Sequence, residues 1–182
     1  MTMTLAIRPI QIEDLEPLTN YWLNSSDDRM IGMGVDLNKL PSKSELKSMM
    51  GSQIDTILEH KKSYALIWLL DNIPVGHCNV NQIQYGQQAY MHLHLWQNNS
   101  RKRGLGSQFV KLSIPQFFKD LKLQRLFCEP YALNPAPNKT LEKIGITFVK
   151  EHICTPGYLN FEQPVKRWVL NKMDLPNALN KL

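Results

Sequence analysis

The chain has 182 residues and a net charge of +5, with 43% apolar residues, 20% charged residues and a pI of about 9.1. This length suits one compact domain over residues 1–182 and is short for two. The sequence lacks both the run of roughly 20 apolar residues that a membrane helix needs and the segments of a signal peptide, so we expect a soluble, cytoplasmic protein with no membrane partner.

The basic balance suits a partner that carries phosphates, either a nucleic acid or a phosphorylated cofactor. The dense basic cluster of the chain is Arg101-Lys102-Arg103, directly before Gly104. A single cluster of this kind favours a local phosphate site, so we do not expect nucleic acid as the partner. The three cysteines are widely spaced and lack the paired spacing of zinc sites, so we expect no metal.

The first third of the chain predicts a strand and two helices around a polar loop. Residues 5–10 have the composition of a strand, and residues 12–22 carry apolar side chains near helical spacing. A second helical pattern covers residues 46–58. The stretch between them, residues 24–41, is polar and contains glycine, so we expect a loop that faces the substrate.

The middle of the chain predicts a meander of three antiparallel strands. Residues 64–70 are nearly all apolar, as in a strand that is covered on both faces. A turn at residues 71–74 leads into a strand over 75–85, and the strand over 90–96 shows a period of two.

The remaining sequence alternates helices and strands, which predicts a mixed α/β class. From Gly104 to about residue 121 the pattern is helical, and Pro115 should bend this helix without ending it. The further expected elements are a strand over 125–128, a helix over 137–143, strands over 146–154 and 165–171, and a polar tail.

The glycines at 104 and 106 stand between a predicted strand and a predicted helix. The first backbone N–H groups of a helix have no partner within it, and they bind phosphate readily. Glycine lets an anion approach the backbone, and the preceding cations add charge attraction. Taken alone, the motif also suits a helix start with a solvated basic run.

Three segments of this chain are similar to motifs of one known family. Residues 101–106 match Gln/Arg-x-x-Gly-x-Gly/Ala, and residues 134–146 resemble an Asn-x-x-Ser segment that leads to Glu-Lys-Leu-Gly-Phe. Residues 8–16 are similar to the opening of enzymes that acetylate ribosomal-protein N-termini. Over nearly its whole length the chain therefore resembles the GCN5-related N-acetyltransferase (GNAT) superfamily, and within it the ribosomal-protein branch.

The resemblance implies a mostly antiparallel central sheet of about seven strands flanked by helices, in which two splayed strands form the acyl-coenzyme A cleft. It implies acetyl-CoA as co-substrate, no metal, and direct transfer of the acetyl group to a primary amine. Asn134 would bind the pantetheine arm, and the main chain at Leu95 and Trp96 would bind the pantetheine and the thioester. The implied cofactor-binding residues are Leu95, Trp96, Arg101, Lys102, Arg103, Gly104, Leu105, Gly106, Ser107 and Asn134.

The chain departs from the family pattern at three positions. Pro137 stands where serine is frequent, Ile146 replaces phenylalanine, and Leu141 stands where many members have the tyrosine that protonates the leaving thiolate. The proton would then come from Tyr131, from Cys128 or from water, or the chain has lost its activity.

Histidine titrates near neutral pH, so His92 and His94 are the candidate bases for the acceptor ammonium. Their spacing of two places both on one face of a strand. A purely structural role is equally open for this pair, and Glu129 is a weaker base candidate. No third ligand stands near the histidines, so we do not expect a zinc site there.

The sequence leaves the acceptor open. A protein N-terminus is the preferred acceptor, and a polyamine, an aminoglycoside or an amino acid is the alternative; a non-catalytic acyl-CoA-binding or nucleic-acid-binding module is the rival from another class. Loop aspartates at 27, 28 and 36 would attract a cationic amine, and Tyr158 would close over it. We expect a monomer or a homodimer.

Overall fold

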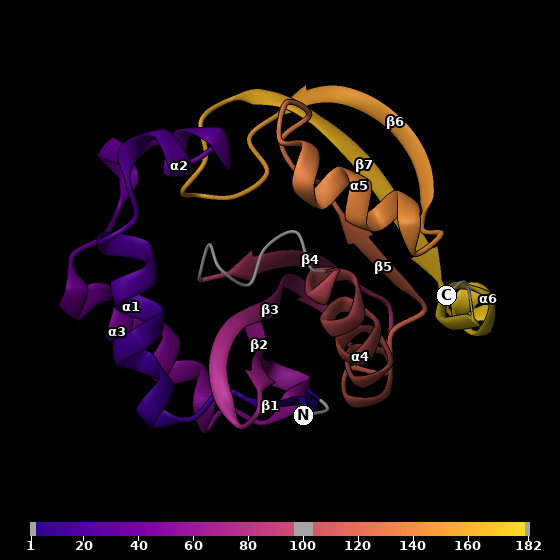
Figure 1. Cartoon of the computed structure of the whole chain (residues 1–182), viewed down its shortest axis with the longest axis horizontal. Coiled ribbons are helices and arrows are strands. Elements are labelled where there is room, and N and C mark those ends of the chain that lie inside the picture. The colour runs from indigo at the N-terminus through magenta and orange to yellow at the C-terminus, as the bar shows by residue number, and fades with distance from the viewer. Residues whose placement is uncertain (1–2, 97–103, 181–182) are drawn as a thin grey trace.

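The computed structural model describes residues 3–96 and 104–180, and its strands form one open sheet (Figure 1). The sheet has seven strands in the order β1-β2-β3-β4-β5-β7-β6, and within the described residues β4 and β5 are the one parallel pair. The fold class expected from the sequence is confirmed. The strands are β1 (Leu5–Pro9), β2 (Ser63–Leu70), β3 (Ile73–Gln84), β4 (Gln88–Leu95), β5 (Arg125–Cys128), β6 (Thr147–Cys154) and β7 (Gln163–Asn171).

Helices flank the sheet, with α1, α2 and α3 gathered at the left of Figure 1 and α4 and α5 at its centre and right. Among the described residues, none of the helices has the length and apolar content to cross a bilayer. The helices are α1 (Leu15–Leu23), α2 (Asp27–Gly32), α3 (Lys43–Ile54), α4 (Leu105–Asp120), α5 (Pro135–Lys143) and α6 (Leu175–Asn180). Two of them correct the sequence analysis, because α2 lies within the expected loop and α6 within the expected polar tail.

The expected meander is present as β2, β3 and β4. Asp71 and Asn72 form the turn between β2 and β3 with φ angles of 50° and 64°. Positive φ at both central residues matches the right-handed twist of a two-residue hairpin, and aspartate and asparagine tolerate this conformation. The β2–β3 register is therefore set by the turn that the sequence predicted.

One face of the meander packs on α4 and forms the hydrophobic core. The Trp68 ring stacks on Phe109 with a centroid separation of 5.1 Å, and its indole N–H donates to Ser113 Oγ at 2.9 Å. The buried indole N–H of Trp68 thus has a hydrogen-bond acceptor on α4. The helix α4 continues through Pro115 to Asp120, as the sequence predicted.

The opposite face is covered near β1 by α1 and α3. The Arg8 guanidinium holds the Asp14 carboxylate through two hydrogen bonds of 2.5 and 2.9 Å, and Asp14 also accepts from the Gln11 N–H at 2.8 Å. This bidentate pair fixes the angle at which α1 leaves β1. Residues 8–16, which resemble the ribosomal-protein branch, therefore contain the Arg8–Asp14 pair that joins β1 to α1.

The loop after α2 is bound to the loop between β6 and β7. Val35 and Asn160 form a β-bridge, and the Asn160 side-chain amide donates to Gly34 O at 2.8 Å. Gly34 has a φ of +83°, and a Cβ there would lie 1.9 Å from Gln163 Oε1, so only glycine fits. Tyr158 of the same β6–β7 loop contacts Met49 of α3.

Candidate functional site

The strands β4 and β5 pair only at their beginnings. Their parallel register runs from Gln88 opposite Arg125 to Tyr90 opposite Phe127, and β4 then continues to Leu95 without a β5 partner. This is the splayed pair that the resemblance implied. Where the two strands separate, the Cys128 thiol of β5 donates to Met91 O of β4 at 3.0 Å. The opening between the strands therefore begins beyond Met91.

The second half of β4 directs main-chain groups into this opening. The Trp96 N–H donates to Val75 O of β3 at 2.9 Å, and in an antiparallel ladder alternate residues face opposite neighbours. Leu93 and Leu95 therefore turn their N–H and C=O groups toward the side that β5 has left. Within the described residues, the N–H groups of Leu93 and Leu95 and the Leu93 carbonyl have no hydrogen-bond partner.

The main-chain groups at the end of β4 differ from the sequence prediction at Trp96 and add Leu93 to it. The Trp96 N–H is bonded to β3, so it is not free for the cofactor. Leu95 retains an N–H that points into the opening, and Leu93 adds a second one that the sequence analysis did not name. Two unpaired amides on a rigid strand are suited to bind a thioester carbonyl as its oxygen gains negative charge.

Arg29 of α2 closes the end of β4. Its guanidinium donates to Leu95 O at 2.7 Å and to Trp96 O at 3.2 Å, and it lies 5.0 Å from the centroid of the Tyr21 ring. A planar guanidinium binds two neighbouring acceptors at once and stacks on aromatic rings. It thus fixes the last carbonyls of the strand that borders the cleft.

The start of α4 carries the predicted phosphate site. Gly104 is the residue before the helix and has a φ of 72°, which glycine adopts without strain. A Cβ at Gly104 or at Gly106 would meet no atom within 4 Å. The N–H groups of Leu105, Gly106 and Ser107 belong to the first helical turn, and within the described residues none of them has an acceptor.

Two features of this segment bear on the sequence prediction. The Ser107 hydroxyl donates to Gly104 O at 2.8 Å, so its side chain stabilises the turn. Arg101, Lys102 and Arg103 lie outside the described residues. Their contribution to phosphate binding stays a prediction.

Asn134 is the residue before α5. Its Oδ1 accepts from the Ala136 N–H at 3.3 Å, and its N–H donates to Tyr131 O at 3.0 Å. Side-chain oxygens of asparagine stabilise the first turn of a helix in this way. The predicted contact of Asn134 with pantetheine would thus be made by a residue that the helix already holds in place.

His92 and His94 lie on one face of β4, as predicted, and a third histidine joins them. His77 of β3 stands opposite His94 and stacks on it at a centroid distance of 4.5 Å. The Trp96 indole N–H donates to His77 Nδ1 at 2.8 Å, and the Tyr21 hydroxyl lies 3.1 Å from His94 Nδ1. His77 was not expected from the sequence, because only the β3–β4 register brings it to this position.

Burial keeps these histidines neutral. It lowers the pKa of His77 to about 3 and that of His92 to about 4. The pKa of His94 also lies well below the ordinary 6.5, because burial and then the neighbouring His77, His92 and Arg29 disfavour its charged form. Neither candidate base therefore has the near-neutral pKa on which the sequence argument relied.

A pocket of about 510 Å³ opens between this sheet face, α1 and α3. It reaches the sheet at His77 and Asn79, which stand opposite His94 and His92 in the β3–β4 ladder. Tyr158 forms part of its wall, and the Tyr158 hydroxyl lies 3.6 Å from Met49 Sδ. The loop expected to close over the acceptor thus borders a cavity next to β4.

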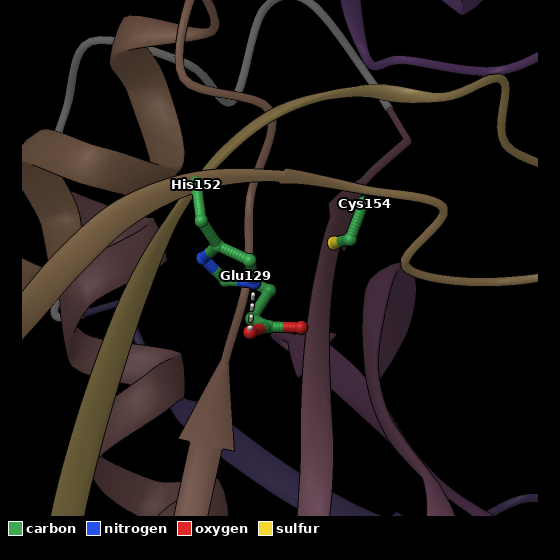
Figure 2. A group of neighbouring side chains, drawn as sticks. All are labelled: Glu129, His152 and Cys154. Atoms are coloured by element: carbon green, nitrogen blue, oxygen red, sulfur yellow. Dashed lines mark ion pairs between the residues drawn. The ribbon is translucent and has the colours of Figure 1, made fainter.

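Glu129, His152 and Cys154 form a cluster beyond the end of β5 (Figure 2). Their candidate ligand atoms all lie within 4.8 Å of one another, and His152 Nε2 is 3.5 Å from Glu129 Oε1. The Arg167 guanidinium donates to that same oxygen, so the carboxylate is neutralised within the protein. Glu129, the weaker base candidate of the sequence, is thus a paired and largely buried carboxylate.

Residues 4–147 match the family model described as the acetyltransferase (GNAT) domain. The chain belongs to the GNAT acetyltransferase family. It is an acetyl-CoA-dependent N-acetyltransferase, with acetyl-CoA as co-substrate. Among curated proteins no match was found.

Solved structures of other acetyltransferases share the fold of this GNAT enzyme. RimL, a ribosomal L7/L12 alpha-N-protein acetyltransferase in complex with coenzyme A, is 17% identical, with a TM-score of 0.73 over 92% of this chain and 94% of that one. Spermidine N-acetyltransferase from Vibrio cholerae is 15% identical, with a TM-score of 0.77 over 95% and 98%. An aminoglycoside acetyltransferase is 16% identical, with a TM-score of 0.70 over 96% and 98%.

The proton donors considered for this GNAT enzyme occupy different environments. Leu141 is fully buried in the core, so the position of the family tyrosine does not face the cleft. The pKa of the Cys128 thiol is raised to about 12, chiefly by burial. Proton transfer from a thiol with this raised pKa to a departing thiolate of ordinary pKa, about 8.5, is unfavourable. The Tyr131 ring packs edge-on against Phe161 at 5.8 Å.

Proposed function

We propose that this enzyme transfers the acetyl group from acetyl-CoA directly to the N-terminal amine of a polypeptide. The main-chain opening of β4 carries this proposal, because it gives the thioester two N–H donors beside the helix start suited to a diphosphate. The amine would approach from the face that bears His92 and His94.

The similarity of residues 8–16 to the ribosomal-protein branch supports a polypeptide acceptor. In the structure these residues join β1 to α1 through the Arg8–Asp14 pair, and α1 supplies Leu18 and Trp22 to the pocket wall. RimL, whose solved structure shares the fold, acts on a protein N-terminus by its name.

In the proposed reaction, the neutral amine nitrogen attacks the thioester carbonyl carbon. The carbonyl oxygen gains negative charge next to the N–H groups of Leu93 and Leu95. The C–S bond then breaks, and the coenzyme A thiolate leaves. Because His92 and His94 are weak bases here, we expect water to take the proton that the acceptor loses and to protonate the thiolate.

Thiol release from acetyl-CoA would test the acceptor. Peptides should release coenzyme A and gain the mass of one acetyl group at the N-terminus. The same peptide with a blocked N-terminus should be inert, and a peptide with a free lysine side chain alone should react poorly. Faster turnover of spermidine or an aminoglycoside than of every free peptide would contradict the proposal and favour the small-molecule alternative.

A further inference from the structure

Just over half of the residues that line the pocket beside β4 are apolar, and most of these come from α1, α3 and the segment that follows α3. The pocket lies between α1, α3 and the sheet, and the end of α4 also contributes to its wall. Its volume of about 510 Å³ is within the usual range for ligand sites. The large apolar side chains of the wall include Leu18, Trp22, Leu46, Met50, Ile54 and Leu58.

The two charged groups among the described lining residues are both engaged by the protein. The Asp120 carboxylate accepts from the Tyr64 hydroxyl at 2.7 Å and from the Gln116 amide at 2.8 Å. The Lys61 ammonium donates to the main-chain carbonyls of Gln53 and Ile54. His77 of the wall is held neutral by burial, which lowers its pKa to about 3. Burial raises the pKa of the Tyr64 and Tyr158 hydroxyls, so these two groups are neutral as well.

This charge pattern opposes a polycation. A polyamine or an aminoglycoside brings several ammonium groups, and each would need a carboxylate or a hydrated position in place of its water shell. The pocket offers one carboxylate, whose two oxygens already accept from Tyr64 and Gln116, and adds the positive charge of Lys61. A chain of methylene groups or an aromatic ring gains free energy when it leaves water to pack against the apolar side chains of this wall.

The aspartates that the sequence offered as attractants for a cation lie elsewhere. Asp27 and Asp28 stand in the first turn of α2, where a negative charge stabilises the helix. Asp36 accepts from the Asn38 N–H at 3.1 Å and pairs with Lys39 at 3.6 Å. None of the three belongs to the described lining of the pocket.

We propose that the pocket selects acceptors whose amine is followed directly by a large apolar group, such as a polypeptide that begins with methionine, leucine or phenylalanine. This inference rests on the proposed function. The amine would lie at the β4 end of the pocket, next to the thioester, and the first side chain would extend between α1 and α3.

Thiol release with a matched peptide series tests the selectivity. The peptides share one body and differ only in the first residue, which is methionine, leucine, phenylalanine, serine or aspartate, and spermidine is assayed alongside. Burial of a large apolar side chain corresponds to roughly a 10- to 150-fold preference, so we expect the apolar group to exceed serine in kcat/KM by at least tenfold. A preference for serine, aspartate or spermidine would overturn the inference.

A charge variant tests the pocket itself. Met49 is partly exposed and contacts Tyr158, so Met49→Glu should fold and should lower kcat/KM for the methionine peptide at least tenfold. Ser48→Glu adds the same charge one residue away, outside the described lining, and should change the ratio between peptides less than twofold.

The outcomes separate the two proposals. Failure of every free peptide to release coenzyme A, with spermidine active, would contradict the proposed function. Turnover of all peptides at similar rates, with Met49→Glu equal to wild type, would contradict the selectivity alone. Faster turnover of long-chain acyl-CoA than of acetyl-CoA, abolished by Met49→Glu, would assign the pocket to the acyl chain and would also overturn the inference.

Discussion

Arg29 of α2 donates a hydrogen bond of 2.7 Å to the carbonyl oxygen of Leu95, the last residue of β4. The loop that the sequence assigned to the substrate is thereby joined to the strand that borders the cofactor cleft. A substitution of Arg29 should therefore weaken the binding of acetyl-CoA, although the Arg29 side chain comes from the acceptor side of the molecule.

We expect Arg29→Met to raise the KM for acetyl-CoA about tenfold, because charged hydrogen bonds contribute about 1.5–3 kcal/mol and tenfold corresponds to about 1.4 kcal/mol. Arg29→Lys keeps the positive charge but not the planar guanidinium, so its KM for acetyl-CoA should lie between the values of the wild type and of Arg29→Met. Arg125→Met, at an exposed arginine of β5, is the control. Steady-state kinetics with unchanged KM in Arg29→Met would refute this role.

The buried histidines should make the fold sensitive to acid. Their folded-state pKa values lie below the unfolded value near 6.5, at about 3 for His77 and about 4 for His92. Above pH 6.5 both states are neutral; as the pH falls toward 4, the unfolded state binds protons that the folded state cannot. The free energy of unfolding should therefore fall by about 1.4 kcal/mol per pH unit for each such histidine.

Urea unfolding between pH 7 and pH 4.5 would measure this loss. His77→Gln keeps an acceptor for the Trp96 indole and removes one of the titrating groups, so its stability should fall less steeply with acid. Stability that is constant over this range in the wild type would show that the histidines are not held neutral.

The pH dependence of kcat/KM should not show the titration of a histidine with the ordinary pKa near 6.5. Because burial lowers the pKa of His94 well below 6.5, we expect kcat/KM to rise with pH as the acceptor ammonium loses its proton. Measuring the profile with two peptides whose N-terminal amines differ in pKa should move the inflection by that difference. An inflection near pH 6.5 that is the same for both peptides, and absent in His94→Gln, would restore His94 as the base.

Restoring the family tyrosine should not help this enzyme. Leu141 is fully buried, so Leu141→Tyr should overpack the core and lower the free energy of unfolding by about 1–3 kcal/mol, without a gain in kcat. Leu133→Tyr, at a side chain that is 73% exposed, is the matched control. Urea unfolding and thiol release measure both effects, and a faster Leu141→Tyr enzyme of normal stability would contradict this view of the site.

The sequence was most informative where local chemistry decides the structure. The turn at Asp71 and Asn72 and the period of two in β4 predicted the meander, because both signals depend on neighbouring residues. The start of α3 was missed: the helix was expected over residues 46–58 but begins after Ser42. The signal was present, because Ser42 and Glu45 form a reciprocal capping box.

The site was predictable only in part, because it combines segments that are distant in the chain. His92 and His94 were found by spacing, whereas His77 joins them through the β3–β4 register. Arg29 was missed because its helix has six residues and stands within a polar stretch, and only the folded chain brings it to Leu95. The burial of His77 and His94, and with it their low pKa, likewise depends on Tyr21 of α1, which packs against both rings.

The diphosphate site at the start of α4 is the central feature of the proposed enzyme, and isothermal titration with acetyl-CoA tests this site directly. A Cβ at Gly106 meets no atom of the protein, so Gly106→Val should leave the free energy of unfolding within about 0.5 kcal/mol of wild type. Gly32→Val, at an equally open helical glycine, is the control. We expect wild type and Gly32→Val to bind acetyl-CoA alike and Gly106→Val to bind at least tenfold more weakly; equal affinity in Gly106→Val, or no binding by wild type at millimolar ligand, would contradict the account.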